Sequence, residues 1–389
     1  MLKRLLSKKQ LYILGINSGT SADGIDLAIV KLSRIGKTIK SEFITGEIAS
    51  YTGKVKKELE SLITAENLSD EILARYDIAF GKYLGKIAST FASKQEYSID
   101  LVASHGQTIG HYPKKKSLLG YKTGATMQIG DGNAIACESG LPIVSDFRRT
   151  DIALGGEGAP LTPHVNQILF SHKTKRRIIV NIGGIANYSY LATGRDMSKI
   201  SGADCGPGNT LIDIAMFLLY KKPFDKDGKI ARTGNVIPAI VSEISRINRR
   251  KNKSTGRELF SSAFVARLLK KHAECSRADI IASLTEATVR EMFVSIKKHL
   301  KPNPDGVFLT GGGRRNLVIV EQLGRLCDPV RVLPIEALGY DGDLVEAVSF
   351  AVLGGCYVYE IPSTLSNVTG ARMGGIAGKL SLPAQVNAK

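Results

Sequence analysis

Apolar and polar positions follow two rhythms along the 389 residues of this chain, one typical of strands and one of helices. Near the start, apolar runs at residues 12–16, 25–32 and 42–49 are joined by polar turns, which predicts a meander of three antiparallel strands. Apolar residues then recur at three- and four-residue spacing over residues 72–91, which predicts an amphipathic helix. Further strands are expected at residues 101–104, 125–129 and 143–147.

The second half of the chain repeats this scheme. Residues 177–182 are predicted to form a strand, Gly183-Gly184 a turn, and residues 186–191 the returning strand. A later apolar strand, residues 307–310, ends in three successive glycines. Because both halves begin with a hairpin and continue through helices, we expect two α/β domains facing a cleft. The helices of this half are expected at residues 210–219, 260–272, 279–300 and 344–359.

Length and composition agree with two soluble domains. A single core stops growing at roughly 250–300 residues, and 43% hydrophobic with 23% charged residues excludes a disordered chain. The five cysteines are widely spaced and form no CxxC pair, so neither a zinc ribbon nor a disulfide scaffold is indicated. A reducing cytoplasm fits best. No run of 18 apolar residues occurs, so we expect no membrane segment.

The charge balance is strongly basic, with 53 Lys and Arg against 36 Asp and Glu, a formal charge of +17. Such an excess raises nucleic acid, an anionic membrane or a phosphorylated substrate as partners. The basic residues form short scattered clusters, aromatic residues amount to only 6%, and no aromatic residues alternate with them to stack bases. We therefore expect a solvated basic surface and no nucleic-acid partner.

A polar, glycine-containing loop at residues 18–26 follows the first strand. Its backbone N–H groups and the hydroxyls of Thr20 and Ser21 can cradle a phosphate, and Asp23 or Asp26 could orient a metal-bound water. The competing interpretation is an ordinary hairpin turn. The loop is not a Walker A motif, and the chain contains no GxGxxG fingerprint, which argues against a Rossmann dinucleotide site.

Two more glycine-rich segments carry candidate chemistry. Asp204 lies in the segment 202–210 before a predicted helix that Asn209 or Thr210 would cap. A carboxylate beside such an anion site suits a general base or a metal-water ligand in phosphoryl transfer, although Asp204 could simply cap the loop. The glycines at 311–313 would let an adenine or ribose lie on the backbone, or could form a flexible connection.

Polar residues at the ends of two first-half strands complete the candidates. His105 and His111 lack the spacing of a zinc site, so His105 is interpreted as a polar group lining the cleft. Arg148 is a candidate for anion recognition, with a surface ion pair to Asp146 as the plainer alternative.

Taken together, these motifs resemble the anhydro-N-acetylmuramic acid kinase family. The resemblance implies two duplicated actin-like (RNase H-like) ATPase domains around a central cleft, ATP and Mg²⁺, and a homodimer. It also implies the substrate 1,6-anhydro-N-acetylmuramic acid and the product N-acetylmuramic acid 6-phosphate. Domain I would comprise residues 1–148 with about 365–389, and domain II residues 149–364. The matching segments are residues 19–26, 104–108, 128–131, 146–149, 155–161, 181–187, 204–209, 222–225, 254–258, 311–316, 346–347 and 368–371.

The resemblance assigns the catalytic carboxylate to Asp204, which with Asp23 would also hold the metal through water. The expected nucleotide-binding residues are Gly19, Thr20, Ser21, Ala22, Asp23, Gly24, Ile25, Asp26, Gly183, Gly184, Gly206, Gly208, Asn209, Gly311, Gly312, Gly313 and Asn316. The expected sugar-binding residues are His105, Gln107, Thr108, Arg148 and Glu346. The chain departs from the family pattern where Asn17 replaces Met, Cys205 replaces Thr, and Lys251-Asn252 replaces two prolines.

Two alternatives keep the same fold, namely a kinase for another sugar and a non-catalytic nucleotide sensor. A sensor would be expected to lose the catalytic carboxylate, whereas Asp204 is present. A nucleic-acid-binding protein would show an affinity that falls steeply with salt.

Overall fold

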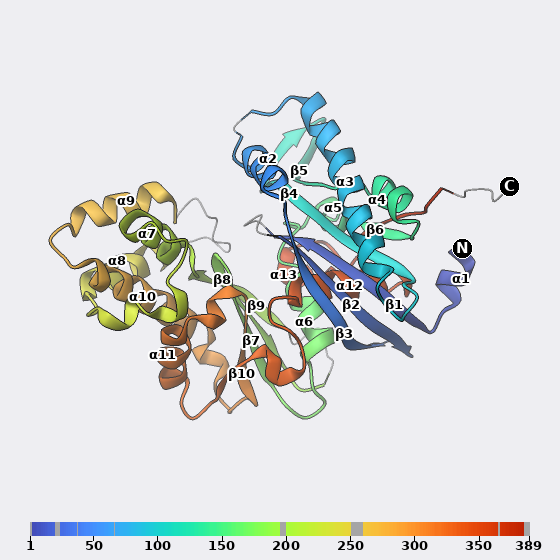
Figure 1. Ribbon diagram of the computed structural model, residues 1–389. Helices are drawn as coiled ribbons and strands as arrows, with labels where there is room; N and C mark the ends of the chain where they lie inside the picture. The colour runs from blue at the N-terminus through green and yellow to red at the C-terminus, as the bar shows by residue number, and fades with distance from the viewer. Residues whose placement is uncertain are drawn as a thin grey trace. The chain divides into compact units, whose positions relative to one another are not determined.

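The computed structural model describes residues 2–19, 24–36, 38–65, 67–194, 200–249, 260–364 and 366–384 (Figure 1). The chain divides into two compact units, unit 1 of residues 1–169 with 344–389 and unit 2 of residues 170–343. The predicted boundaries placed residues 149–169 and 344–364 in the second domain, whereas their contacts join them to unit 1.

Helix α12 (Val345–Val358) explains the second of these differences, because it packs on strands β1, β2 and β4 of unit 1. Gly15 on β1 makes the approach possible, since a Cβ there would overlap the carbonyl of Ala347. A helix that meets a strand backbone this closely belongs to the domain of that strand.

Unit 1 is built on a seven-stranded mixed sheet in the order β12-β6-β4-β1-β2-β3, with β5 paired to β4. The first three strands form the predicted antiparallel meander, while β4 runs parallel to β1 and β6 parallel to β4. The strands are β1 (Gln10–Ser18), β2 (Gly24–Ile35), β3 (Thr38–Ser50), β4 (Leu101–Leu118), β5 (Tyr121–Ile129), β6 (Ile143–Ser145) and β12 (Lys379–Ser381).

Unit 2 repeats this topology in a five-stranded sheet of order β11-β10-β7-β8-β9. Strands β7, β8 and β9 form an antiparallel meander, and β10 and β11 add parallel strands beside β7. The repeated order confirms the predicted duplicated α/β fold. The strands are β7 (Arg177–Ile182), β8 (Ile185–Leu191), β9 (Ser201–Pro207), β10 (Gly306–Thr310) and β11 (Val332–Pro334).

Helices cover both sheets, and the predicted long helices are confirmed within a few residues. Unit 1 contains α1 (Leu2–Ser7), α2 (Gly53–Thr64), α3 (Asp70–Ala92), α4 (Gly132–Ser139), α5 (Phe147–Ala153), α12 and α13 (Ser366–Thr369). Helix α6 (Thr162–Phe170) runs up to the boundary, and unit 2 contains α7 (Thr210–Tyr220), α8 (Pro238–Arg249), α9 (Ser262–Lys271), α10 (Arg277–Ile296) and α11 (Leu317–Cys327). Short 3₁₀ turns occur at Lys226–Gly228, Ala231–Thr233, Lys297–His299, Gly312–Arg315 and Ile335–Leu338.

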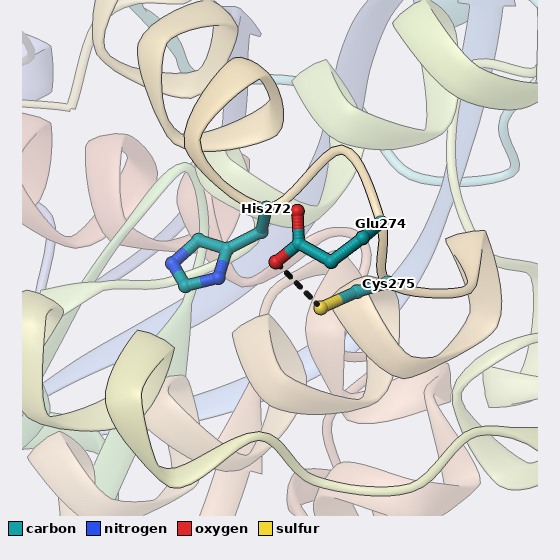
Figure 2. A group of neighbouring side chains, drawn as sticks. All are labelled: His272, Glu274 and Cys275. Carbon is teal, nitrogen blue, oxygen red and sulfur yellow. Dashed lines mark hydrogen bonds between the residues drawn. The ribbon is translucent and has the colours of Figure 1, made fainter.

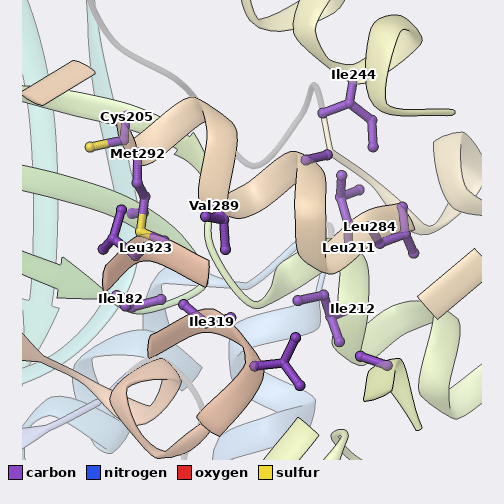
Figure 3. Close-up of a cluster of buried hydrophobic side chains, with 14 of the residues drawn as sticks. Ile182, Cys205, Leu211, Ile212, Ile244, Leu284, Val289, Met292, Ile319 and Leu323 are labelled. Carbon is purple, nitrogen blue, oxygen red and sulfur yellow. The ribbon is translucent and has the colours of Figure 1, made fainter. Parts of the chain in front are cut away.

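Each unit has its own hydrophobic core. In unit 2 the core surrounds α10, whose Leu284, Val289 and Met292 pack with Ile182 of β7 and Ile319 of α11 (Figure 3). Burying each such side chain contributes about 1.5–3 kcal/mol, so α10 is an anchored element on which a site can be built. Among the helices of the described ranges, none is long and apolar enough to cross a membrane.

Candidate active site

In unit 1, a buried amide connects two carboxylates that the sequence analysis selected separately. Asn17 lies opposite Asp26 in the β1–β2 pairing, and Glu346 lies in the first turn of α12. The Asn17 amide donates to Asp26 Oδ2 at 3.2 Å and to Glu346 Oε2 at 2.8 Å. Asn17 is only 2% exposed. Asn17, which stands where the family pattern has Met, therefore links Asp26 to Glu346.

Gln107 lies in a buried hydrogen-bond chain beside this group. Its carbonyl oxygen accepts from the Ser18 hydroxyl, and that hydroxyl lies 2.6 Å from the Tyr51 Oη. Burial raises the pKa of Tyr51 to about 12, so the phenol keeps its proton near neutral pH and can donate to Ser18. The chain fixes Gln107, while Thr108 accepts from the Gln128 amide at 3.2 Å.

Arg148 is held in place by His105. Its Nε donates to His105 Nε2 at 3.0 Å, and its Nη1 donates to the Gly158 carbonyl at 2.9 Å. Because Nε2 is the acceptor, the ring is neutral and its proton is on Nδ1, which donates to the Gly106 carbonyl at 3.1 Å. Burial, together with the positive charge of Arg148, holds the pKa of His105 well below its usual value. A stacked contact with the Phe350 ring at 4.5 Å fixes the imidazole plane.

The charge of Arg148 acts on Glu346 as well. Burial lowers the pKa of Arg148, and the negative charge of Glu346 opposes that shift. Unit 1 thus brings together the predicted residues Asp26, His105, Arg148 and Glu346, with Gln107 behind them. One local prediction was wrong, because residue 147 begins helix α5 and does not end a strand; Asp146 turns the chain with a left-handed φ of 59°.

A polar pocket of unit 1 lies next to His105. Its walls include Asp77 and Asp146, whose pKa values are raised by burial, and the cations Arg149 and Lys379. The predicted ion pair at Asp146 is made by Arg149, at 3.4 Å.

In unit 2, three predicted glycine-rich segments meet at the ends of β7, β9 and β10. The backbone N–H of Asn209 donates to the Gly183 carbonyl at 2.8 Å, and that of Gly208 donates to Gly184 at 2.9 Å. A Cβ added at Gly313 would lie 2.8 Å from Asn209 Oδ1, so the third segment also touches Asn209. At Gly312 an added Cβ would have Asn209 Nδ2, at 4.0 Å, as its nearest neighbour among the described residues, so this backbone can accept a flat group.

Asp204 lies on β9, half-buried and opposite Asn187 of β8. A loop is predicted for this segment, but pairing with β8 makes it a strand up to Pro207. The expected cap of α7 also differs in detail. Asn209 occupies the N-cap position of α7, yet its amide donates to the Ile182 carbonyl at 3.2 Å and does not cap the helix. Asn316 caps α11, accepting from Val318 and Ile319.

Arg314, which the sequence analysis did not single out, organises the turn after β10. It donates to Asp343 Oδ1 at 2.8 Å and to Glu336 Oε1 at 3.0 Å. Burial by itself would raise the pKa of Asp343, but hydrogen bonds and charge from Arg314 and Arg315 lower it overall. An arginine directly after three glycines is the feature of the sequence that could have identified this role of Arg314.

The predicted phosphate loop is described only at its two ends, which include Gly19, Gly24 and Ile25. Its residues Thr20, Ser21, Ala22 and Asp23 lie outside the described residues.

One group of possible metal ligands lies elsewhere in unit 2, in the turn between α9 and α10 (Figure 2). Donor atoms of His272, Glu274 and Cys275 lie within 4.8 Å of one another. The Cys275 thiol donates to Glu274 at 3.8 Å, and burial and the charge of Glu274 raise the pKa of this thiol. A metal-ligating histidine usually donates its other ring N–H to a partner, whereas within the described ranges His272 Nε2 has none. We therefore assign no metal site to this turn.

Comparison with known proteins finds the same family that the sequence motifs resemble, over nearly the whole chain. The family described as anhydro-N-acetylmuramic acid kinase matches residues 10–382. The chain is 33% identical over 383 residues to the anhydro-N-acetylmuramic acid kinase of Bacillus thuringiensis subsp. konkukian (strain 97-27), covering 96% of this chain and 100% of the relative. It is 36% identical over 378 residues to that of Trichormus variabilis (strain ATCC 29413 / PCC 7937), covering 95% and 96%. Among solved structures, ligand-bound xylulose kinase from Lactobacillus acidophilus aligns with a TM-score of 0.43 and 10% identity, covering 96% of this chain and 94% of that one.

Proposed function

Because the chain belongs to the anhydro-N-acetylmuramic acid kinase family, we propose that it converts 1,6-anhydro-N-acetylmuramic acid and ATP to N-acetylmuramic acid 6-phosphate and ADP. The observation that carries this proposal is the family match over residues 10–382, within which the candidate carboxylate Asp204 is retained. The reaction serves the recycling of cell-wall sugar. We further propose that the enzyme acts in the cytoplasm as a homodimer, which light scattering of the purified protein would test.

ATP is proposed to bind unit 2. The convergence of the glycine-rich segments around Asn209 supports this, because glycine lets a ligand approach the backbone closely. The first turn of α7 follows directly, and the N-terminus of a helix favours anionic groups. Phosphates are therefore assigned to the Gly206–Gly208 side, and the adenosine to the open backbone at Gly312.

Mg²⁺ is proposed to accompany ATP, held through water by Asp204 of unit 2. The donor chemistry fits, because Asp204 offers half-buried carboxylate oxygens, the ligand type that Mg²⁺ prefers. When bound, the ion would neutralise negative charge on the phosphates.

The acidic sugar is proposed to bind unit 1. Arg148 would pair with the lactyl carboxylate, since a guanidinium recognises a planar carboxylate through parallel hydrogen bonds. The bond from Nε to His105 and the bond to Gly158 support this role by fixing the guanidinium plane. Glu346 would accept from a sugar hydroxyl or from the attacking water, and Asn17 fixes one of its oxygens.

Asp204 is proposed to act as the general base. The substrate's O6 is tied to C1 in the anhydro bridge and has no proton to lose, so a water must first open the ring. Asp204 takes a proton from that water as the water oxygen bonds to C1 and the C1–O6 bond breaks. O6 then attacks the γ-phosphorus, and the bond from that phosphorus to the bridging oxygen breaks to release ADP. A positioned base contributes about 10²–10⁴-fold in rate.

Mass spectrometry of the product made in ¹⁸O-labelled water tests the coupled reaction. Label at C1 together with a phosphate on O6 is expected. A phosphorylated sugar with an intact bridge would refute the coupling, and the absence of any phosphorylated product would refute the kinase assignment. Asp204→Asn should lower turnover about 10²–10⁴-fold while ATP binding, measured by calorimetry, stays intact; turnover near that of the wild type would refute the base assignment.

A further inference from the structure

We propose that Asn248 and Glu291 are positioning residues that set the direction of the Asp204 carboxylate. This inference rests on the proposed function, in which Asp204 is the base. The relevant feature is a β-bulge in β9. Asn187 of β8 pairs with Asp204, but Ala186, which directly precedes Asn187, pairs with Gly206. Cys205 is therefore the extra residue directly after Asp204, and a bulge of this kind re-aims the neighbouring side chain.

The Asn248 amide holds the bulge. Its Nδ2 donates one proton to the Cys205 carbonyl at 2.8 Å and the other to Glu291 Oε2 at 2.5 Å. Both partners are acceptors, which fixes the orientation of the amide. The second Glu291 oxygen accepts from the Ser245 hydroxyl at 2.5 Å. The three side chains come from α8 and α10, two helices that pack against each other within unit 2.

The cluster is buried in apolar surroundings. Glu291 is 6% exposed and Asn248 9%. Ile244, one helical turn before Asn248, and Met292, next to Glu291, belong to the core shown in Figure 3. An apolar residue at position 291 would avoid the cost of burying a carboxylate. We explain the carboxylate at this position by its contact with Asn248. It orients the Asn248 amide, and the hydrogen bond from that amide holds the Cys205 carbonyl at one angle.

Two further contacts fix the same backbone. Gly206 has a φ of +149°, and a Cβ there would lie 2.8 Å from Asn248 Nδ2, so the amide fills the space that a side chain would need. The Thr288 hydroxyl, also on α10, donates to the Gly208 carbonyl at 3.0 Å. The segment from Asp204 to Gly208 is thus tied at two carbonyls to buried helices, and the carboxylate is held ready before substrate arrives.

Asn248→Ala is the direct test, measured with purified full-length enzyme. A displacement of about 1 Å at a reacting group can cost about 10²-fold in rate, so kcat should fall about 10–100-fold. KM for sugar and for ATP should change by no more than about threefold, since Asn248 is assigned no ligand contact. Thr285→Val is the matched control, because Thr285 is also buried and, among the described residues, its hydroxyl bonds to the Ile281 carbonyl in the same helix α10. The control should lower thermal stability comparably and leave kcat unchanged.

The Asp204→Asn background separates positioning from general damage. If Asn248 acts through Asp204, adding Asn248→Ala to Asp204→Asn should cause no further loss of kcat. A wild-type kcat in folded Asn248→Ala, or the same fold loss in both backgrounds, overturns the proposal while leaving the proposed function intact. Full activity of Asp204→Asn would instead refute the base, and the positioning role with it. Should Asn248→Ala fail to fold, Glu291→Met gives the same comparison, because it removes both oxygens that accept from Asn248 and Ser245 and nearly keeps the side-chain volume.

Discussion

Asp213 should make unit 2 less stable as the pH rises from about 4 to about 7. Asp213 lies in the first turn of α7, between the buried residues Ile212 and Ala215 of that helix. Burial raises the pKa of its carboxyl from 3.8 to about 7. Over this range the folded state holds a proton that the unfolded state has released, so stability must fall with rising pH and level off above about 7.

The size of the effect follows from the difference between about 7 and 3.8, which is about 3 pKa units. At about 1.4 kcal/mol per unit, the limit is about 4 kcal/mol. The first turn of a helix favours a negative charge there, so we expect about half of that limit. Asp213→Asn removes the titration. The variant should be about 2 kcal/mol more stable than the wild type at pH 8, and about equal to it near pH 4.

Thermal unfolding followed at several pH values between 4 and 8.5 measures this difference, and hydrogen exchange in α7 assigns it to unit 2. The matched control is Asp227→Asn, since Asp227 is a half-exposed acid of the same unit whose ion pair is made with the exposed Lys229. A raised pKa of Asp213 in the folded state is refuted if Asp213→Asn is no more stable than the wild type at pH 8, or if its gain in stability is the same at every pH.

Three further outcomes are expected from single contacts. His105→Leu removes the acceptor of the Arg148 Nε, so KM for the anhydro-sugar should rise about tenfold with little change in KM for ATP; steady-state kinetics decides, and an unchanged sugar KM would contradict the role of Arg148. Thr369→Val removes the 2.6 Å hydrogen bond to the fully buried Asp151, so the free energy of unfolding should drop by about 1–3 kcal/mol in urea titrations, and an unaltered midpoint would argue against this contact. Asn17→Met restores the family residue but removes the amide shared by two carboxylates, so kcat should fall severalfold; equal or higher kcat would show that the amide is dispensable.

The repeating patterns were sufficient to predict the skeleton of the fold. Strand runs at residues 12–16, 25–32 and 42–49 lie within β1, β2 and β3, and the run 177–182 coincides with β7. The runs in β1, β2 and β7 succeed because most of their apolar side chains are buried, so period and burial agree. Helix α10 was predicted for the same reason, although its burial is wider than a single stripe. The run in β3 has no buried residue between 42 and 49 and is held by its pairing with β2.

Segments without such a pattern were missed, and β9 is the most consequential. Its sequence from Ser201 to Pro207 is rich in glycine and small polar residues, which have low strand propensity. It is a strand because β8 offers it a row of hydrogen-bond partners, and pairing of this kind is a non-local property. The domain boundary at α12 was misplaced for a similar reason, since the helix pattern does not say which sheet the helix packs against.

In the candidate site, too, some features could be predicted from the sequence and others depend on the fold. Residue types and order were enough to select Asp204, Arg148, Glu346 and the glycine-rich segments, because phosphates and acidic sugars need carboxylates, cations and open backbone at recognisable places in the chain. The supporting contacts depend on the tertiary structure, since Asn17 reaches Glu346 and Asn248 reaches Cys205 across large distances in sequence. A side chain's chemistry is encoded at its own position, whereas its direction is set by partners that only folding brings within hydrogen-bonding distance.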